Sequence, residues 1–188
     1  MINERNKESV EETRFNMSKT TTIQKLANAL KEKKVDSQLI SFLQKFNKLK
    51  NYFTSSSCAG RIILLGLDKE ESKKPNLFVG KWHRKVKLQE ITSLLEKDLC
   101  FDEIWFKQES FIFHFVCKNL HYATKLLKIK ANFGIKRCGI FKIEDGRYII
   151  ELMSTSHISF PVKLGKEILI DKQNLEKIVK KAITKLEK

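Results

Sequence analysis

The strongest constraint on the fold is a series of strand and helix signals in the second half of the chain. Residues 101–107 and 111–117 are rich in aromatic and β-branched side chains, which is typical of β-strands. Asn119 can cap an amphipathic helix that follows them. Residues 135–143 and 147–153 then lie on either side of an acidic turn that ends in glycine. The resulting strand–helix–strand–strand order, without regular βαβ alternation, predicts an α+β fold.

Apolar residues at helical spacing predict four further helices. The first follows a run of three threonines that begins at Thr20, and the second begins at Asp36, another capping residue type. The third lies in the middle of the chain and the fourth at its C-terminal end. Their apolar residues are Ile23, Leu26, Ala27 and Leu30; Leu39, Ile40, Leu43 and Phe46; Leu88, Ile91, Leu94 and Leu95; and Leu175, Ile178, Val179, Ala182, Ile183 and Leu186.

The first half of the chain also contains strand signals. Residues 52–57 and 61–67 read as a hairpin-like pair of strands interrupted by Gly60, and residues 78–83 as a weaker strand. The charged segment 68–77 is expected to be a loop.

The length of 188 residues suits one compact domain and is too short for two ordinary ones. Residues 1–19 are polar and without period, and we expect them to form a frayed or loosely helical lead-in. Residues 20–188 are predicted to form a single α+β domain, a mixed β-sheet packed with about five helices rather than a doubly wound nucleotide-binding fold.

Composition narrows the class of partner. Thirty-seven Lys and Arg against twenty-two Asp and Glu give a net charge of +15, which attracts polyanions such as nucleic acid or, alternatively, an anionic membrane surface. The hydrophobic content of 41% argues against disorder. The longest apolar run, residues 111–117, is far shorter than the roughly 20 residues that span a bilayer. With no recognisable signal peptide, we expect a cytoplasmic protein without membrane contact, and a monomer.

Several common catalytic sites have no signal in this sequence. Neither the glycine-rich dinucleotide-binding turn nor the phosphate-binding P-loop is present. The four His and four Cys are scattered without metal-ligand spacing, so no metal site is expected. Cys100, Cys117 and Cys138 lie in apolar, strand-like segments and are expected to pack in the core.

Three features can carry chemistry. The first is the run Ser55-Ser-Ser-Cys-Ala-Gly-Arg61, whose hydroxyls, backbone amides and guanidinium can bind an oxyanion, or which can simply be a strand end with a serine-rich turn. The second is Trp82 and His83 among cationic residues, either a base-stacking site or a basic loop with its Trp in the core. The third is His114 inside an apolar strand, either a core residue or a proton acceptor.

Taken together and in order, these features resemble the tRNA wybutosine-synthesizing protein 3 family in its archaeal form, from about Phe15 to the C-terminus. The resemblance rests on Val35-Asp36; Asn47; Tyr52-Phe-Thr-Ser-Ser-Ser-Cys-Ala-Gly-Arg61; Gly80-Lys-Trp-His83; Phe111-Ile-Phe-His114; Gly134-Ile-Lys-Arg-Cys-Gly-Ile140; and Glu151 with Ser154-Thr155 before Pro161.

The resemblance implies an S-adenosylmethionine-dependent methyltransferase. Its acceptor would be a ring nitrogen of a tricyclic, guanine-derived base at position 37 of tRNA-Phe, a 4-demethylwyosine-type intermediate with a 7-aminocarboxypropyl group, on the way to wybutosine derivatives. The Lys-rich faces would bind the anticodon stem-loop. The alternatives are a non-catalytic basic tRNA-binding module and, more weakly, a small-molecule enzyme.

Roles for individual residues follow from this implied reaction. Expected contacts of the methyl donor are Ser55, Ser56, Ser57, Gly60, Arg61 and Trp82. Arg61 would bind the donor's carboxylate or a phosphate, and Trp82 would stack on adenine or on the target base. His114 or His83 would accept the proton of the ring nitrogen. Because that nitrogen is already nucleophilic, we expect Cys58 to pack in the pocket without bonding to the substrate.

Overall fold

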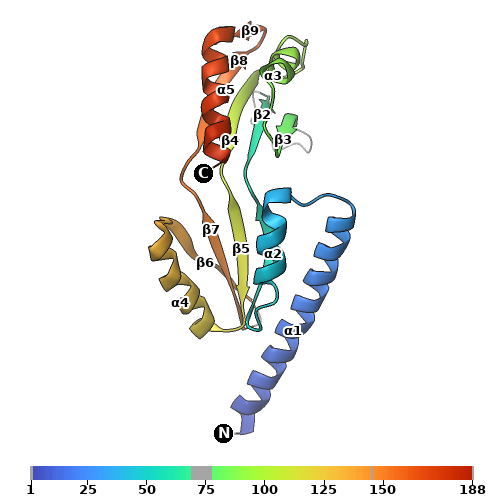
Figure 1. The fold of residues 1–188 in the computed structure, drawn as a ribbon, viewed down its shortest axis with the longest axis vertical. Helices are drawn as coiled ribbons and strands as arrows, with labels where there is room; N and C mark the ends of the chain where they lie inside the picture. The colour runs from blue at the N-terminus through green and yellow to red at the C-terminus, as the bar shows by residue number, and fades with distance from the viewer. Residues whose placement is uncertain (1, 69–77, 145, 188) are drawn as a thin grey trace. The chain divides into compact units, whose positions relative to one another are not determined.

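The structure is a computed structural model that describes residues 2–68, 78–144 and 146–187 (Figure 1). The α-helices are α1 (Ile2–Lys31), α2 (Ile40–Phe46), α3 (Leu88–Leu95), α4 (Leu120–Ile129) and α5 (Lys172–Leu186), and the short 3-10 helices are η1 (Ser37–Leu39) and η2 (Lys130–Phe133). The strands are β1 (Tyr52–Cys58), β2 (Arg61–Leu67), β3 (Phe78–Trp82), β4 (Glu103–Glu109), β5 (Ile112–Cys117), β6 (Arg137–Glu144), β7 (Arg147–Met153), β8 (Ile158–Leu164) and β9 (Glu167–Ile168).

The chain divides into two compact units. Unit 1 consists of Met1–Ala59 and Ile112–Thr155, and unit 2 of Gly60–Phe111 and Ser156–Lys188. Each unit contains one antiparallel sheet, with the strand order β1-β5-β7-β6 in unit 1 and β3-β2-β4-β8-β9 in unit 2.

In unit 1, helices α1 and α2 pack beside strand β1, and α4 packs against β5, β6 and β7. Phe15 of α1 is fully buried against Phe53 of β1, with ring centroids 5.3 Å apart. A second cluster surrounds Phe115, Cys117 and Ile150 on the side of α2 and α4. Burial raises the pKa of the Cys117 thiol to about 12, which leaves it protonated.

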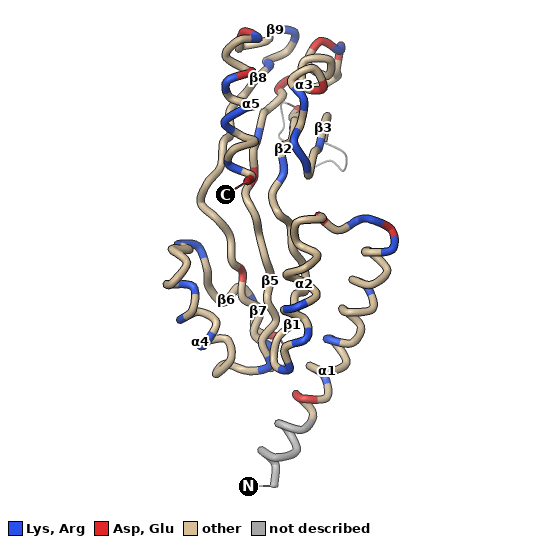
Figure 2. The backbone as a smooth tube through the Cα atoms, in the orientation of Figure 1, with Lys and Arg blue, Asp and Glu red and all other residues tan. Residues whose placement is uncertain are grey.

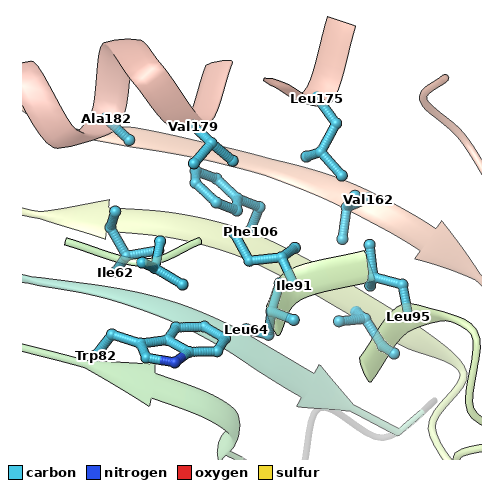
Figure 3. Packing of buried hydrophobic residues seen from close by; sticks show 12 residues of the cluster. Ile62, Leu64, Trp82, Ile91, Leu95, Phe106, Val162, Leu175, Val179 and Ala182 are labelled. Carbon is cyan, nitrogen blue, oxygen red and sulfur yellow. The ribbon is translucent and has the colours of Figure 1, made fainter. Parts of the chain in front are cut away.

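Unit 2 has a larger core, in which α3 and α5 supply apolar side chains to the sheet. Figure 3 shows Leu175, Val179 and Ala182 of α5 facing this core. Ile91 and Leu95 of α3 belong to the same cluster, and all five side chains are at least 97% buried. The period of 3.6 residues that predicted α5 is therefore the period of its buried stripe.

Within the described residues, the α+β class and the five α-helices agree with the sequence prediction, and the two antiparallel sheets differ from a doubly wound fold, as predicted. The strands, however, form two antiparallel sheets instead of one mixed sheet. Strands β1 and β2 are not a hairpin, since β1 pairs with β5 and β2 pairs with β3 and β4. Strands β8 and β9 were not predicted. Most of the expected loop at 68–77 lies outside the described residues.

The start predicted for the first helix, after the threonines at Thr20, is also corrected. Residues 2–31 form one continuous helix, so the run of threonines does not start it. The first half of α1 is held against the sheet by Phe15, which is buried against Phe53 of β1. Of the three cysteines expected in the core, Cys117 is buried and Cys138 partly buried, whereas Cys100 is exposed. No helix in the described parts of the chain is long and apolar enough to cross a membrane.

Candidate active site

The serine segment of β1 is held at both ends by side chains from the preceding helical region. The buried amide of Asn47 accepts a hydrogen bond from the backbone N–H of Thr54 at 2.8 Å and donates one to its hydroxyl at 3.1 Å. Beyond the serines, Asp36 Oδ2 accepts a hydrogen bond from the backbone N–H of Ala59 at 2.8 Å. Asp36 makes no capping hydrogen bond to η1, so its role differs from the predicted helix cap. These two polar residues fix the path of the serine segment.

An irregularity in β1 determines which serine faces its neighbour. The register with β5 shifts between Thr54, which lies opposite Phe115, and Ser56, which lies opposite His114. Ser55 is the extra residue of this bulge, and its hydroxyl lies 3.5 Å from the carbonyl oxygen of His114. Bulges re-aim side chains in this way beside many active sites. If the ladder continued regularly from Thr54, Ser56 would lie opposite Phe113 and its side chain would point to the other face of the sheet.

Ser56, His114 and Glu151 form a hydrogen-bonded row across three strands. Residues 56 and 114 are paired between β1 and β5, and residues 114 and 151 between β5 and β7. The Ser56 hydroxyl lies 2.5 Å from Nδ1 of His114, and Oε2 of Glu151 lies 3.1 Å from Nε2. The histidine and glutamate side chains are 21% and 30% exposed, respectively. His114 is therefore not a simple apolar core residue, because both nitrogens of its imidazole have hydrogen-bond partners in the protein.

A cavity of about 440 Å³ opens beside the serine segment in unit 1. This volume falls within the range of small-molecule pockets. Its lining residues come from α1, α2 and β1: Thr22, Lys25, Leu26, Ala29, Leu43, Thr54, Ser55, Ser56 and Ser57. The three predicted serines thus share one cavity with a cation, Lys25. Sequence reasoning did not select Lys25, although its spacing of three from Thr22 places both on one side of a helix.

An exposed aromatic side chain lies next to the histidine. The Phe141 ring of β6 is 64% exposed, and its centroid is 5.3 Å from that of His114. An exposed aromatic face can stack on a nucleobase. Phe141 was missed in the sequence because a lone aromatic in a strand gives no sign of which face it occupies.

Gly60 and Arg61, predicted donor contacts, belong to unit 2 and have partners there. Gly60 has a φ of +106°, and a Cβ at this position would lie 2.8 Å from the carbonyl oxygen of Glu109. The glycine is therefore needed for a left-handed backbone and a close approach to β4. Arg61 Nε donates to Glu109 Oε2 at 2.6 Å, and its guanidinium lies 5.6 Å from the ring centroid of Phe78.

The predicted stacking role of Trp82 is corrected by its burial. The indole is 8% exposed, lies in the core of unit 2 (Figure 3) and donates from Nε1 to Glu90 at 3.2 Å. An indole this deeply buried offers little surface for stacking on a base. The same glutamate binds Arg84, so the basic cluster contains its own counter-ion. His83 is exposed in unit 2, whereas His114 is in unit 1.

Basic residues occur along α4, the following turn and the start of β6 in unit 1, and along α5 in unit 2 (Figure 2). In unit 1, Lys125, Lys128, Lys136 and Arg137 are exposed. Lys130 is partly buried and donates to the carbonyl oxygen of Cys138 at 2.8 Å. The predicted basic face of α4 is thus solvent-accessible, except for Lys130, which ties α4 to β6.

Comparison with known proteins gives a consistent result. The chain is 34% identical over 171 residues to a Thermococcus sibiricus protein named tRNA(Phe) 7-((3-amino-3-carboxypropyl)-4-demethylwyosine(37)-N(4))-methyltransferase. The aligned residues make up 91% of this chain and 86% of that protein. A Methanocaldococcus jannaschii protein of the same name is 32% identical over 177 residues, covering 93% of this chain and 90% of the relative.

Solved structures agree with the sequence comparison. A Pyrococcus horikoshii protein superposes with a TM-score of 0.84 at 32% identity, covering 94% of this chain and 88% of the other. An Aeropyrum pernix protein described as hypothetical superposes with a TM-score of 0.69 at 25% identity, covering 80% and 88%. A family model described as Methyltransferase TYW3 matches residues 17–188. The resemblance inferred from the sequence motifs is confirmed: this chain belongs to the methyltransferase TYW3 family.

Proposed function

We propose that this protein transfers a methyl group from S-adenosylmethionine to the N4 ring nitrogen of 7-(3-amino-3-carboxypropyl)-4-demethylwyosine at position 37 of tRNA(Phe). The observation that carries the proposal is the family match over residues 17–188, because it includes every residue of the cavity and of the Ser56–His114–Glu151 row. The relatives named for this reaction align over about nine-tenths of the chain.

Methyl transfer from a sulfonium donor to a nitrogen is a direct displacement, so the protein has to align donor and acceptor and remove a proton. In our proposal the cavity of unit 1 receives the donor. The hydroxyls of Ser55 and Ser57 and the ammonium of Lys25 line this cavity and suit the donor's carboxylate. Arg61 is a less direct candidate for that carboxylate, because Glu109 already binds its Nε.

The acceptor base would lie on the side of His114. His114 supplies the proton acceptor for the ring nitrogen, with His83 as the other sequence candidate. Phe141, exposed beside the imidazole, would stack on the tricyclic base in place of the buried Trp82. The basic face of α4 and the start of β6 would bind phosphates of the anticodon stem-loop.

Thermal unfolding with added ligands separates this function from the alternatives. S-adenosylmethionine at roughly 100 times its dissociation constant should stabilise the native state by about 2.7 kcal/mol. Unmodified anticodon stem-loop should also raise the unfolding temperature, and this effect should weaken as salt increases. A response to RNA alone would mean a non-catalytic binding module, and a response to the donor alone would mean a small-molecule enzyme.

A further inference from the structure

Both ring nitrogens of His114 are occupied by protein partners, which determines how this residue can act. A glutamate carboxylate accepts hydrogen bonds and does not donate them. In the neutral imidazole, the Nε2 that faces Glu151 therefore carries the hydrogen, and Nδ1 presents its lone pair to the hydroxyl of Ser56. In this arrangement, the serine hydroxyl donates to the imidazole.

The position of Ser56 makes it the member of the row that a substrate would meet. Its side chain is exposed and lines the cavity, whereas those of His114 and Glu151 are about three-quarters buried. The bulge at Ser55 and the hydrogen bonds that Asn47 and Asp36 accept from the backbone hold this part of β1 in register. The serine oxygen is thus pre-positioned between the imidazole and the cavity.

We propose that Ser56, His114 and Glu151 form a proton relay for methyl transfer, with Ser56 as the catalytic residue that contacts the acceptor nitrogen. Glu151 is a positioning residue that fixes the tautomer of His114. This inference rests on the proposed function and assigns Ser56 a role different from donor binding.

Methyl transfer through this row is accompanied by movement of one proton from the acceptor nitrogen to His114. The acceptor nitrogen forms a bond to the donor's methyl carbon, the carbon–sulfur bond breaks, and its electron pair stays on sulfur as a thioether. The proton of the nitrogen moves to Ser56 Oγ while the Ser56 hydroxyl proton moves to Nδ1 of His114. The imidazolium that results is stabilised by the carboxylate of Glu151 and later releases its proton to water. Positioned acid–base groups contribute about 10² to 10⁴-fold to such rates.

Single-turnover methyl transfer to tRNA(Phe) tests the relay, with donor and RNA dissociation constants measured separately. Ser56→Ala should lower the rate constant by about 10²-fold, at the lower end of that range, and Glu151→Gln by about 10-fold. Both should leave the two dissociation constants within about twofold of the wild-type values. Ser41→Ala on α2 and Glu144→Gln on β6, matched changes at exposed positions, should retain the wild-type rate.

A second measurement needs no substrate and tests the geometry alone. The imidazole ¹⁵N resonances of His114 in the wild-type protein should show hydrogen on Nε2, and Glu151→Gln should weaken that preference. Wild-type rates in Ser56→Ala, a rate loss that matches a loss of donor affinity, or hydrogen on Nδ1 would overturn the relay. If the wild-type protein transferred no methyl group at all, the proposed function would fail, while the ¹⁵N result would still decide the tautomer.

Discussion

Asn47 binds Thr54 through both ends of its amide, accepting from the backbone N–H at 2.8 Å and donating to the hydroxyl at 3.1 Å. Both residues are buried, and Thr54 directly precedes the bulge that turns Ser56 towards His114. A residue at the end of α2 therefore determines the geometry of a strand seven positions further along the chain. The Asn47–Thr54 pair therefore contributes both to the stability of unit 1 and to the geometry of the proposed site.

Asn47→Ala should lower the free energy of unfolding by about 1–3 kcal/mol, because a buried N–H loses its partner. Urea unfolding followed by circular dichroism measures the change. Lys48→Ala, at the exposed neighbouring position, is the matched control and should stay within about 0.5 kcal/mol of wild type. An Asn47→Ala protein as stable as the control would show that the amide is not a structural anchor.

Phe141→Ala should weaken binding of the anticodon stem-loop by about 1–3 kcal/mol, the usual value of stacking one base on an aromatic ring. Fluorescence anisotropy with labelled RNA gives the dissociation constant. The comparison is with Phe133→Ala in η2, which removes an aromatic ring that is 71% exposed and makes no ring contact with His114 among those described. Equal losses in the two variants would contradict a stacking role specific to Phe141.

Cys58→Ala should retain methyl transfer within a few-fold of wild type. The acceptor in the proposed reaction is a nitrogen, so no covalent bond to a thiol is required, and Cys58 at the end of β1 is only partly buried. The rate is measured with labelled donor, together with the unfolding temperature and the donor dissociation constant. Complete loss of turnover in a folded variant that binds the donor normally would make Cys58 part of the chemistry.

The acid stability of unit 2 should depend on Glu90. Arg84, followed by the backbone N–H of Lys87, lowers the pKa of this carboxyl from 4.5 to about 2. Because the pKa is lower in the folded state, the stabilisation is present above pH 4.5 and is lost as the pH falls towards 2. The urea midpoint of the wild-type protein should therefore fall over that interval, and that of Glu90→Gln should fall less.

Glu96→Gln, at the end of the same helix, serves as the control for this pH dependence. A Glu90→Gln protein that loses stability with acid as steeply as this control would mean that the Arg84–Glu90 pair does not couple folding to pH.

The elements that sequence alone predicted are those with a local signal. The buried stripe of α5 and the cap of α4, where the side chain of Asn119 accepts from the backbone N–H of Tyr122, are readable over a few residues. Strand β8 was missed because Pro161 lies within it, and proline normally argues against an inner strand. The structure accommodates Pro161 opposite Trp105, next to a register irregularity in the ladder with β4.

Strand pairing and the site depend on contacts that no local pattern reveals. Gly60 suggested a hairpin, but the partner of each flanking strand lies elsewhere in the chain. His114 was recognised as a candidate, whereas its link to Ser56 and Glu151 spans 58 and 37 residues and depends on a one-residue bulge. A tryptophan in a basic segment looks the same in sequence whether its ring is exposed or, as for Trp82, buried.

The most direct test of the proposed function is transfer of a labelled methyl group from S-adenosylmethionine to tRNA(Phe) purified from a strain that lacks this gene. We expect one methyl group per tRNA(Phe), located by mass spectrometry on the N4 nitrogen of the tricyclic base at position 37, and none on tRNA(Phe) from a strain that retains the gene. No incorporation, or incorporation at another nucleotide, by folded protein that binds the donor would contradict it.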